Sequence, residues 1–366
     1  MIHCTPIGSY DPADVTFLLK LVSLQPTDVA EKERLIQTGA AHYSEMITEE
    51  RRPDPHYLRL YEEALERHQN RIADEIISLA RQIVDRVASG DLDRKVTLCS
   101  LVRAGVPYGV LLGRELRAVA KDLDVEHFGV SIIRGRGLDR NAMSSILHRR
   151  PASGVVFVDG WTGKGAISRE LHKSWPEIAG AAPVLAVLAD PAGYADIAGS
   201  REDWLIPSGI LGANISGLIS RSILNSEIIG PEDFHGTIPV NHLADIDLSR
   251  TFVDRIAGLC AERRKSVRTV PLEAALDCRE RAMRCVNQVA QREGVGNLNR
   301  IKPGIAEATR AVLRRRPHKV YVRHEDDPDV ASLLHLCRLD GVAVEVAPRV
   351  LGPYKAITVI AEIGAE

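Results

Sequence analysis

The sequence predicts an α/β protein with a parallel sheet flanked by helices, a helical N-terminal segment and a second, small α/β domain. Three features of the 366-residue chain lead to this prediction. Short apolar runs alternate with helix-like stretches in the middle of the chain, a pattern typical of βαβ units and of a parallel sheet covered on both faces. A long amphipathic stretch comes before these runs, and a shorter alternation of the same kind ends the chain.

The overall composition places the chain among soluble globular proteins. Hydrophobic residues make up 45% and charged residues 26%, which excludes a wholly disordered or collagen-like protein, and the length favours two or three domains. No run approaches the ~20 unbroken apolar residues of a membrane helix, and the first residues lack the features of a secretory signal. The six cysteines are scattered without a C-x-x-C pair, so we expect no zinc site or disulfide framework and a cytoplasmic location.

The N-terminal segment, residues 1–90, is expected to contain a long helix that starts near Tyr57 and stops at Gly90. Apolar residues three and four apart form one face of this helix, which predicts packing against a core rather than chemistry. The residues on this face are Leu58, Tyr61, Leu65, Ile72, Ile76, Leu79, Ile83 and Val87.

The central domain, residues 91–268, is expected to supply the parallel sheet. Its strands are predicted at Val96–Val102, His127–Ile133, Gly154–Val158 and Pro183–Ala189, with helices at Tyr108–Lys121 and Gly165–Lys173. Because ligands bind at the carboxyl ends of the strands in such sheets, the loops directly after the strands are the first places to look for a site.

The C-terminal domain, residues 269–366, is predicted as a small α/β sandwich after a linker near Val267–Pro271. Its elements are a helix at Ile305–Arg316, a strand at KVYV, a helix around Val330–Leu339, and strands at VAVEVAP and ITVIAEI. From Arg263 to Lys319 the chain holds fifteen lysines and arginines against five acids, although the net charge of the whole chain is −2. This basic block indicates a module with its own anionic partner, or alternatively a solvated surface.

The strongest chemical signal is the loop in VVFVDGWTGKGAI, where an apolar strand ends in Asp159 and a glycine-rich turn leads into a helix. Backbone amides of such a turn, the start of the helix and a lysine can together bind a phosphate. Asp159 can accept hydrogen bonds from ribose hydroxyls or hold a metal ion through water. The alternative is a structural turn with a capping Asp. The candidate binding residues are Asp159, Gly160, Thr162, Gly163, Lys164, Gly165 and Ala166.

Two further loops carry arginines after predicted strands. Arg103, followed by Ala104 and Gly105, would present a fork of donors to phosphate oxygens. Arg134 and Arg136 lie in SIIRGRGLDRN, which would be either a loop that closes over a charged ligand or an ordinary solvated connection.

In this order the three loops, Arg103–Gly105, Arg134–Asn141 and Asp159–Ala166, resemble the pyrophosphate loop, catalytic loop and phosphoribosyl-pyrophosphate motif of type I phosphoribosyltransferases. The family motif carries two adjacent acids, whereas here Asp159 is followed by Gly160. The resemblance implies a type I phosphoribosyltransferase-like sheet. It also implies that phosphoribosyl pyrophosphate or a nucleotide binds with Mg²⁺, with Arg103, Arg134, Arg136 and Asp159 as catalytic residues and Asp159 as the metal ligand.

Longer phrases resemble one bacterial group of phosphoribosyltransferase-like proteins linked to tellurium-resistance and stress genes, also described as StiP-type cysteine proteases. The phrases are GSYDPADVTFLLK, SIIRGRGLDRNAM, FVDGWTGKGAI and DWLIPSGILGANISGLISRSILN. The C-terminal run that starts at RIKPGIAEATRAVLRRRP resembles a Pelota-type RNA-binding domain. Together these resemblances cover nearly the whole chain.

RNA is therefore an expected partner of the C-terminal domain. A loop before a helix offers free amides to a phosphate, arginines at the end of the helix can pair with further phosphates, and a tyrosine can stack on a base. The residues expected to bind RNA are Lys302, Gly304, Arg314, Arg315, Arg316, Tyr354 and Lys355.

Two other functions stay open beside the transferase. The first is a cysteine protease, for which Cys99, in the strand before Arg103, is the best-placed thiol, although a buried inert thiol is the simpler reading of its apolar surroundings. The second is a non-catalytic stress protein that binds nucleotides and RNA. No membrane partner is expected, and a homodimer is left open.

Overall fold

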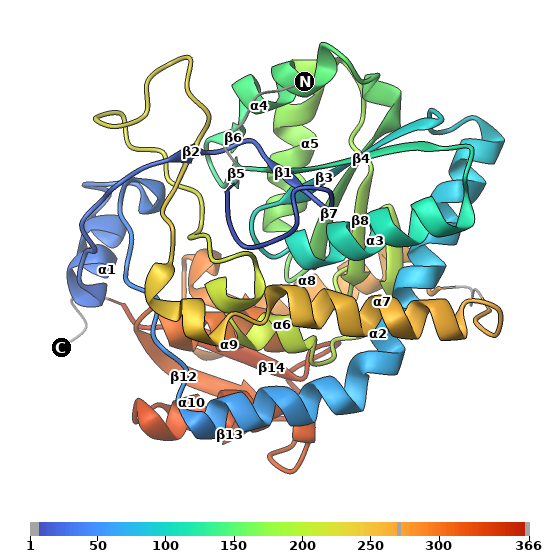
Figure 1. Cartoon of the computed structure of the whole chain (residues 1–366). Helices are drawn as coiled ribbons and strands as arrows, with labels where there is room; N and C mark the ends of the chain where they lie inside the picture. The colour runs from blue at the N-terminus through green and yellow to red at the C-terminus, as the bar shows by residue number, and fades with distance from the viewer. Residues whose placement is uncertain (1–6, 269–271, 363–366) are drawn as a thin grey trace.

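The central sheet is built from six strands that all run in parallel. The computed structural model describes residues 7–268 and 272–362, and in it the strand order is β1-β4-β3-β7-β8-β9 (Figure 1). The strands are β1 (Thr16–Phe17), β3 (Lys95–Leu101), β4 (Asp124–Val130), β7 (Val155–Trp161), β8 (Leu185–Ala189) and β9 (Ile197–Ser200). The parallel α/β class and the four central strands predicted from the sequence are thus confirmed, and β1 and β9 are additions.

Helices cover both faces of this sheet. On one face lie α2 (Pro55–Ser89), α3 (Val106–Val119) and α7 (Ser249–Arg263), and on the other lie α4 (Arg140–Leu147) and α5 (Ala166–Ala179). The side chains of each strand alternate between the two faces, as in β3, where Val96 and Leu98 face the α2 side and Cys99 and Leu101 face the α5 side. Two buried faces explain why the strands read as continuous apolar runs.

The long helix α2 confirms the amphipathic pattern. Asp54 accepts a hydrogen bond from the Tyr57 amide at its start, and Gly90 ends it with a φ of 86°, a conformation that glycine adopts at little cost. The N-terminal segment is more than this helix, however. It also contains α1 (Val29–Thr38), β1 in the central sheet, and β2 (Lys20–Leu21), which pairs with β10 (Gly236–Thr237). Strands β1 and β2 and helix α2 are therefore built into the central domain, whereas α1 contacts the C-terminal unit through Lys32, Glu33 and Gln37.

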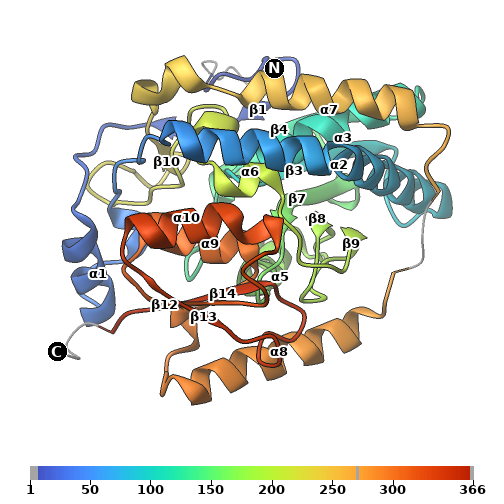
Figure 2. The same cartoon turned by 90° about the horizontal axis from the view of Figure 1, so that it is seen from below.

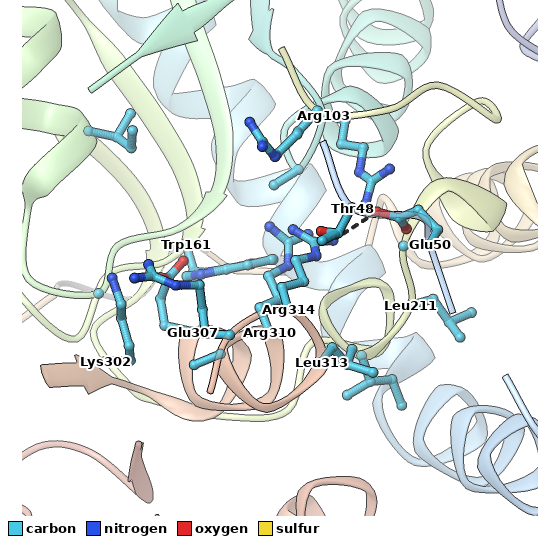
Figure 3. Close-up of a pocket in the computed structure, with 18 of the residues that line it drawn as sticks. Thr48, Glu50, Arg103, Trp161, Leu211, Lys302, Glu307, Arg310, Leu313 and Arg314 are labelled. Carbon is cyan, nitrogen blue, oxygen red and sulfur yellow. Dashed lines mark hydrogen bonds and ion pairs between the residues drawn. The ribbon is translucent and has the colours of Figure 1, made fainter. Parts of the chain in front are cut away.

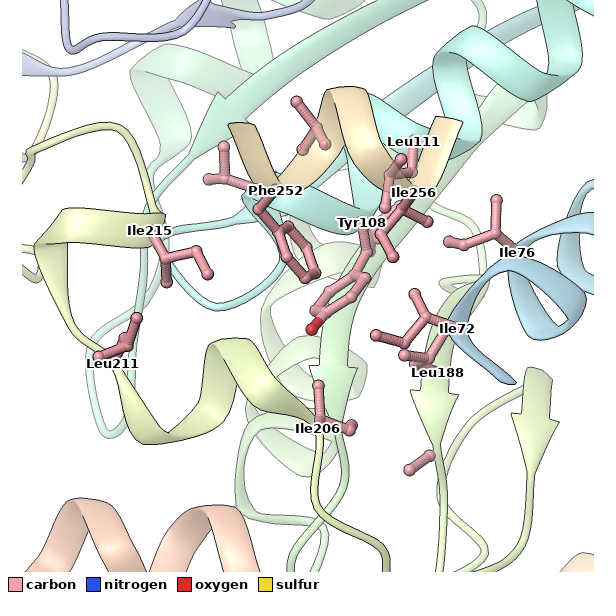
Figure 4. Close-up of a cluster of buried hydrophobic side chains, with 14 of the residues drawn as sticks. Ile72, Ile76, Tyr108, Leu111, Leu188, Ile206, Leu211, Ile215, Phe252 and Ile256 are labelled. Carbon is pink, nitrogen blue, oxygen red and sulfur yellow. The ribbon is translucent and has the colours of Figure 1, made fainter. Parts of the chain in front are cut away.

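The core between the sheet and its helices is centred on two aromatic rings. Tyr108 of α3 and Phe252 of α7 lie side by side, with Ile72 of α2 and Leu188 of β8 against them (Figure 4). Each of these side chains is at most 1% exposed. Strand β8, helices α2 and α3, and the helix α7, which comes much later in the chain, therefore share one core. This core fixes the carboxyl ends of β3 and β7 relative to each other.

The C-terminal unit is a four-stranded sheet between two layers of helices (Figure 2). Helix α8 (Ala275–Arg292) covers one face, and α9 (Ile305–Arg314) and α10 (Ala331–Leu339) cover the other. The strands are β12 (Pro317–Val322), β13 (Ala343–Val346), β14 (Ala356–Ile360) and β11 (Ile301–Pro303), in the order β11-β14-β12-β13. The predicted elements are confirmed, and β11 and α8 are additions to them. The proposed linker around Val267–Pro271 falls largely outside the described residues.

The small unit is packed directly against the central domain. Ile305, Ala308 and Val312 of α9 belong to the same buried cluster as the α2 and α3 side chains. The short helix α6 (Pro207–Ile210) completes this junction beside α9. The hairpin of β5 (Ile132–Ile133) and β6 (Gly137–Leu138) packs on α5. No helix of the described part of the chain is long and apolar enough to cross a membrane.

Candidate functional site

The site lies where the order of strands in the sheet reverses. After β3 the chain adds β4 on one side, then crosses to the other side for β7, β8 and β9. Open α/β sheets bind ligands in the crevice at such a switch point, outside the carboxyl ends of the strands. A cavity of about 410 Å³ lies there. It is lined by residues 101–104 and 159–168 after the two strands, by 47–54, and by 301–303 with the α9 face of the C-terminal unit.

Glycines allow the loops to approach one another closely. A Cβ on Gly105 would stand 2.0 Å from the Val158 carbonyl oxygen of the neighbouring strand. Gly165 has a φ of +74°, and a Cβ there would meet the ring of Tyr194 at 2.5 Å. Only glycine fits both places without displacing backbone or ring. The glycine pattern in the sequence therefore reflects tight packing at this edge of the sheet.

The glycine-rich turn leads into α5 as predicted, and the start of that helix has no side-chain cap. Its first-turn amides are thus available to an anion. The Lys164 side chain, however, does not reach into open space. Its ammonium donates to the carbonyl oxygens of Leu298 and Ile301, the latter at 2.7 Å. Thr162 likewise donates its hydroxyl to the buried Asp190.

Asp159 is the acid at the centre of the cavity. The pKa of its carboxyl is raised to about 7, mainly by burial and to a lesser extent by the nearby Glu307. The Gly160 amide, which donates at 2.8 Å, and Arg310 act in the opposite direction. A carboxyl with this pKa exchanges its proton near neutral pH. The sequence prediction of a functional acid at this strand end is consistent with the arrangement, and its metal-binding role stays a prediction.

Arg103 is held by the protein rather than presented as an open fork. Its guanidinium donates to a Glu50 carboxylate oxygen at 2.5 Å and to the Ile219 carbonyl at 2.7 Å, and only 4% of the residue is exposed. Arg103 and a more distant Arg314 hold the pKa of Glu50 at about 2, against the effect of burial. This corrects the expectation that Arg103 presents an open fork to a phosphate: both terminal nitrogens are bonded within the protein, and only its buried Nε has no partner among the described residues.

The two arginines of the third loop separate. Arg134 and Arg136 lie at the tip of the β5–β6 hairpin, so the loop is a short β-ribbon turn. Arg134 lines the cavity and donates to Asn299 of the C-terminal unit at 3.3 Å. Arg136 instead pairs with Glu45 at 3.2 Å and lines a different hollow. Of the two arginines of this loop that were predicted to be catalytic, only Arg134 is therefore brought to the site.

Four cations of the C-terminal unit line the same cavity: Lys302 from β11, Arg310 and Arg314 from α9, and Arg315 directly after that helix. Figure 3 shows Arg310 and Arg314 rising from the helix, with Trp161 and Lys302 on one side and Glu50 on the other. The guanidinium of Arg310 lies 4.5 Å from the centre of the Trp161 ring. Its Nε is buried and has no hydrogen-bond partner within the described ranges.

Of the other residues predicted to bind RNA, Arg315 also lines the cavity, and the rest lie elsewhere. Tyr354 is fully buried and donates its hydroxyl to the Gly163 carbonyl at 2.7 Å, so its ring is closed to a stacking base, contrary to expectation. Arg315 forms a two-pronged pair with Glu33, and Lys355 pairs with Asp327 and Asp329. Gly304 has a φ of +89° and caps α9. Arg316, just after α9, is exposed.

Sequence reasoning missed several residues of the cavity. Arg310 stands four residues before Arg314, and this spacing on a predicted helix was the available signal that both face one way. Glu50 and Lys32 gave no signal, because they come from segments with no motif. The ammonium of Lys32 donates to Thr48 at 2.7 Å, and burial together with neighbouring arginines lowers its pKa to about 7.

The described cysteines do not resemble an activated nucleophile. Cys99, Cys260, Cys278, Cys285 and Cys337 are all buried, and burial raises the pKa of each thiol. A catalytic thiol needs the opposite, a lowered pKa beside a histidine. Cys4 lies outside the described residues. Within the described chain, the cysteine geometry gives no support to peptide hydrolysis.

Comparison with protein families gives two matches. A family described as "Tellurite-like stress resistance cysteine protease StiP" matches residues 8–257, and the PELOTA RNA binding domain matches residues 280–362. A curated protein of Acinetobacter baylyi, "Cysteine protease StiP", is 42% identical over 369 residues, which cover 98% of this chain and 94% of that protein.

Solved structures give distant likenesses only. The hypoxanthine phosphoribosyltransferase of Trypanosoma cruzi is 14% identical with a TM-score of 0.29, over 36% of this chain and 77% of that chain. An HGPRT-ase from Leishmania tarentolae in complex with GMP is 13% identical with a TM-score of 0.28, over 35% and 72% of the two chains. Scores of this size establish no shared activity.

Proposed function

The chain belongs to the StiP family and ends in a PELOTA RNA-binding domain, and on this premise we propose that it is a phosphoribosyltransferase-like enzyme. Its ligand would be phosphoribosyl pyrophosphate or a nucleotide, bound with Mg²⁺ in the cavity at the ends of β3 and β7. One observation carries the proposal: a buried acid and the uncapped start of α5 face a group of enclosed cations at the switch point of a parallel sheet.

The charge of the cavity favours a polyanion. Lys32, Arg103, Lys302, Arg310 and Arg314 line it, and Glu50, Asp159 and Glu307 are the enclosed acids nearest to them. Burial is the main reason that the pKa of Lys302 falls to about 8 and that of Arg310 to about 10, and neighbouring arginines lower both further. Phosphate groups beside Lys302, Arg310 and Arg314 would relieve the repulsion and pair these enclosed charges.

The chemistry of a phosphoribosyl transfer suits such a site. When pyrophosphate leaves the ribose, negative charge grows on its oxygens, and preorganised cations and amides stabilise that charge without a covalent nucleophile. In the proposed pose the first-turn amides of α5 hold the 5′-phosphate, and Asp159 accepts hydrogen bonds from the ribose. Lys164 acts indirectly, by tying the phosphate loop to Leu298 and Ile301 of the C-terminal unit.

Magnesium fits this donor set in part. Mg²⁺ prefers oxygen ligands and usually combines one or two carboxylates with substrate phosphates and water. Asp159 and Glu307 supply such carboxylates, and the described residues hold no cluster of three or more potential metal ligands. The ion would neutralise charge on the departing pyrophosphate. In this proposal it therefore arrives with the ligand.

Asp159→Asn is expected to weaken Mg²⁺-dependent binding of phosphoribosyl pyrophosphate by about 1–3 kcal/mol, the size of a lost charged contact. Because the raised pKa of Asp159 is about 7, binding by the unmodified protein should strengthen as the pH rises through 7, and this pH dependence should disappear in the variant. Calorimetry between pH 6 and 8.5 measures both effects.

Weaker ligand binding by Asp159→Asn would not be explained by loss of folding. A carboxyl whose pKa is raised by folding costs stability above that pKa, so Asp159→Asn should be no less stable at pH 8. Asp277→Asn, on the exposed start of α8, is the matched control. Equal affinity of all three proteins would remove Asp159 from the site and, with it, the proposed function.

Cys99→Ala separates the transferase from the protease. Cys99 is completely buried in β3, so its loss should cost about 1 kcal/mol of stability as a packing defect and leave phosphoribosyl pyrophosphate binding unchanged. Thermal unfolding and calorimetry check the two parts. A peptidase activity of the unmodified protein that vanishes in a folded Cys99→Ala variant would reverse the assignment.

RNA is the proposed partner of the C-terminal unit, on the strength of the PELOTA match. Most of the residues predicted to bind RNA are not free on an outer surface. Lys302 and Arg314 lie inside the cavity, while Arg315 and Lys355 are paired with acids. Many arginines of the basic block are paired as well: Arg263 with Asp74, Arg264 with Glu115, Arg281 with Glu273 and Arg292 with Glu345.

A further inference from the structure

The cations of the cavity fall into two kinds. Those of the central domain are already hydrogen-bonded to the protein: Arg103 to Glu50 and Ile219, and Lys164 to backbone carbonyls. Among those of the C-terminal unit, Arg315 is likewise paired with Glu33, but the other three are not bonded in this way. Lys302 and Arg310 have no hydrogen-bond partner among the described residues, and the nearest acid to Arg314 is Glu50, at 3.8 Å. The donors that remain for a ligand therefore belong to the C-terminal unit.

These free donors form a row. Arg310 and Arg314 are one turn apart on α9 and face the same way, about 6 Å from each other along the helix. Trp161 supports the Arg310 guanidinium from one side and so holds its direction. Lys302 lies at the Trp161 side of the row (Figure 3). The row thus begins close to Asp159, because the charge of Arg310 lowers the pKa of that carboxyl.

We propose that Lys302, Arg310 and Arg314 form a binding subsite for a chain of two or more phosphate groups, laid along α9. This inference rests on the proposed function in using the same cavity, and it assigns the diphosphate-binding role to the C-terminal unit. A single phosphate or carboxylate would engage one guanidinium fork and leave the next one unpaired. A diphosphate satisfies both forks and the ammonium together.

Alternative roles for this row are weaker. A purely structural role would require acid partners in direct contact. Within the described residues, neither Lys302 nor Arg310 forms an ion pair with Glu307 or Asp159, and Glu50 is already bonded to Arg103. An open RNA surface would require exposure, yet the three side chains share the cavity with Asp159 and Trp161. Exposed cations suited to an outer surface, such as Arg338 on α10, lie outside it.

The test uses the full chain, without Mg²⁺, and inorganic pyrophosphate and orthophosphate as probes at equal ionic strength. Trp161 provides an intrinsic fluorescence signal next to Arg310, and calorimetry gives the affinities. We expect pyrophosphate to bind at least tenfold more tightly than orthophosphate. Arg310→Ala and Arg314→Ala should each lower pyrophosphate affinity tenfold or more. Arg310→Lys should also lose most of the pyrophosphate affinity, because a lysine lacks the guanidinium fork. Arg338→Ala, which removes the same charge outside the cavity, should change nothing.

Several results would overturn the inference. Equal affinities for the two probes would exclude a subsite for a phosphate chain. Arg310→Ala and Arg314→Ala that behave like Arg338→Ala would remove α9 from the site, and Arg310→Lys keeps this readable if one alanine variant fails to fold. A structured RNA that loses affinity in Arg310→Ala, while pyrophosphate binding is unaffected, would make the row an RNA contact.

The inference and the proposed function can fail separately. Pyrophosphate binding that depends on Arg310 in a protein that does not bind phosphoribosyl pyrophosphate would leave the subsite and remove the transferase. Phosphoribosyl pyrophosphate binding that depends on Asp159 but not on Arg310 would leave the transferase and remove the subsite.

Discussion

Phe252→Ala should destabilise the protein by about 3–5 kcal/mol, the cost of a large cavity in a well-packed core. Phe252 is 1% exposed and stands where α7 meets α3 and the segment around Ile215 (Figure 4). Because α7 follows the α6 region in sequence and packs on α2 and α3, its ring joins parts of the chain that are far apart. Urea unfolding followed by circular dichroism measures the loss as a lower midpoint with an unchanged slope.

Thr251→Ala is the matched control for this variant. Thr251 precedes Phe252 on the same helix and is exposed, so its truncation should change stability by no more than about 0.5 kcal/mol. If Phe252→Ala were as stable as Thr251→Ala, α7 would not be part of the cooperative core, and the placement of the two aromatic rings at its centre would be wrong.

Glu50→Ala should destabilise by about 3–5 kcal/mol, because it leaves the buried Arg103 without its counter-charge. Glu50 also accepts a hydrogen bond from the Ala213 amide at 3.1 Å. Its folded pKa of about 2 lies below the unfolded value, so its contribution is complete above about pH 5 and is lost as the pH falls through 4 toward 2. The stability difference between the two proteins should therefore shrink over that range.

Two further variants sharpen this second prediction. Glu49→Ala removes a neighbouring exposed acid and should be nearly neutral. Arg103→Met in the Glu50→Ala background should recover much of the loss, since it removes the unpaired charge and keeps an apolar chain of similar length. If Glu50→Ala were as stable as Glu49→Ala at pH 7, water or another group would be compensating the charge of Arg103. The ion pair between Glu50 and Arg103 would then not stabilise this part of the cavity.

The sequence could predict the elements of the fold because their signals are local. The spacing of Leu65, Ile72 and Ile76 places them on one side of any helix, and the unbroken apolar run of β3 predicts a strand buried on both faces. It missed β11, whose three residues contain a proline and a lysine and gain their strand geometry only by pairing with β14. Short strands of this kind carry too few residues for a periodic pattern.

Part of the candidate site could be predicted from the sequence in the same way. Asp159 and the glycines after it follow a recognisable strand, and a strand end followed by a helix predicts an anion site at the sheet edge. The sequence could not predict which charged side chains are paired within the protein and which face the cavity. Arg103 and Arg314 look alike in the sequence, yet the first is bonded to Glu50 and Ile219 and the second faces the cavity with its donors largely free. Pairing is decided by which distant segments meet.

The sequence by itself determined the parallel sheet, the loop at Asp159 and the small basic unit at the C-terminal end, because hydrophobic period, glycine position and charge count are properties of short segments. The tertiary structure alone decided that the two regions form one site. Ile305, Ala308 and Val312 bury α9 in the core of the central domain, and this packing turns Arg310 and Arg314 toward Asp159. The direction of a helix's charged face follows from where its apolar face is buried. For α9, the surface that buries the apolar face lies far away in the chain.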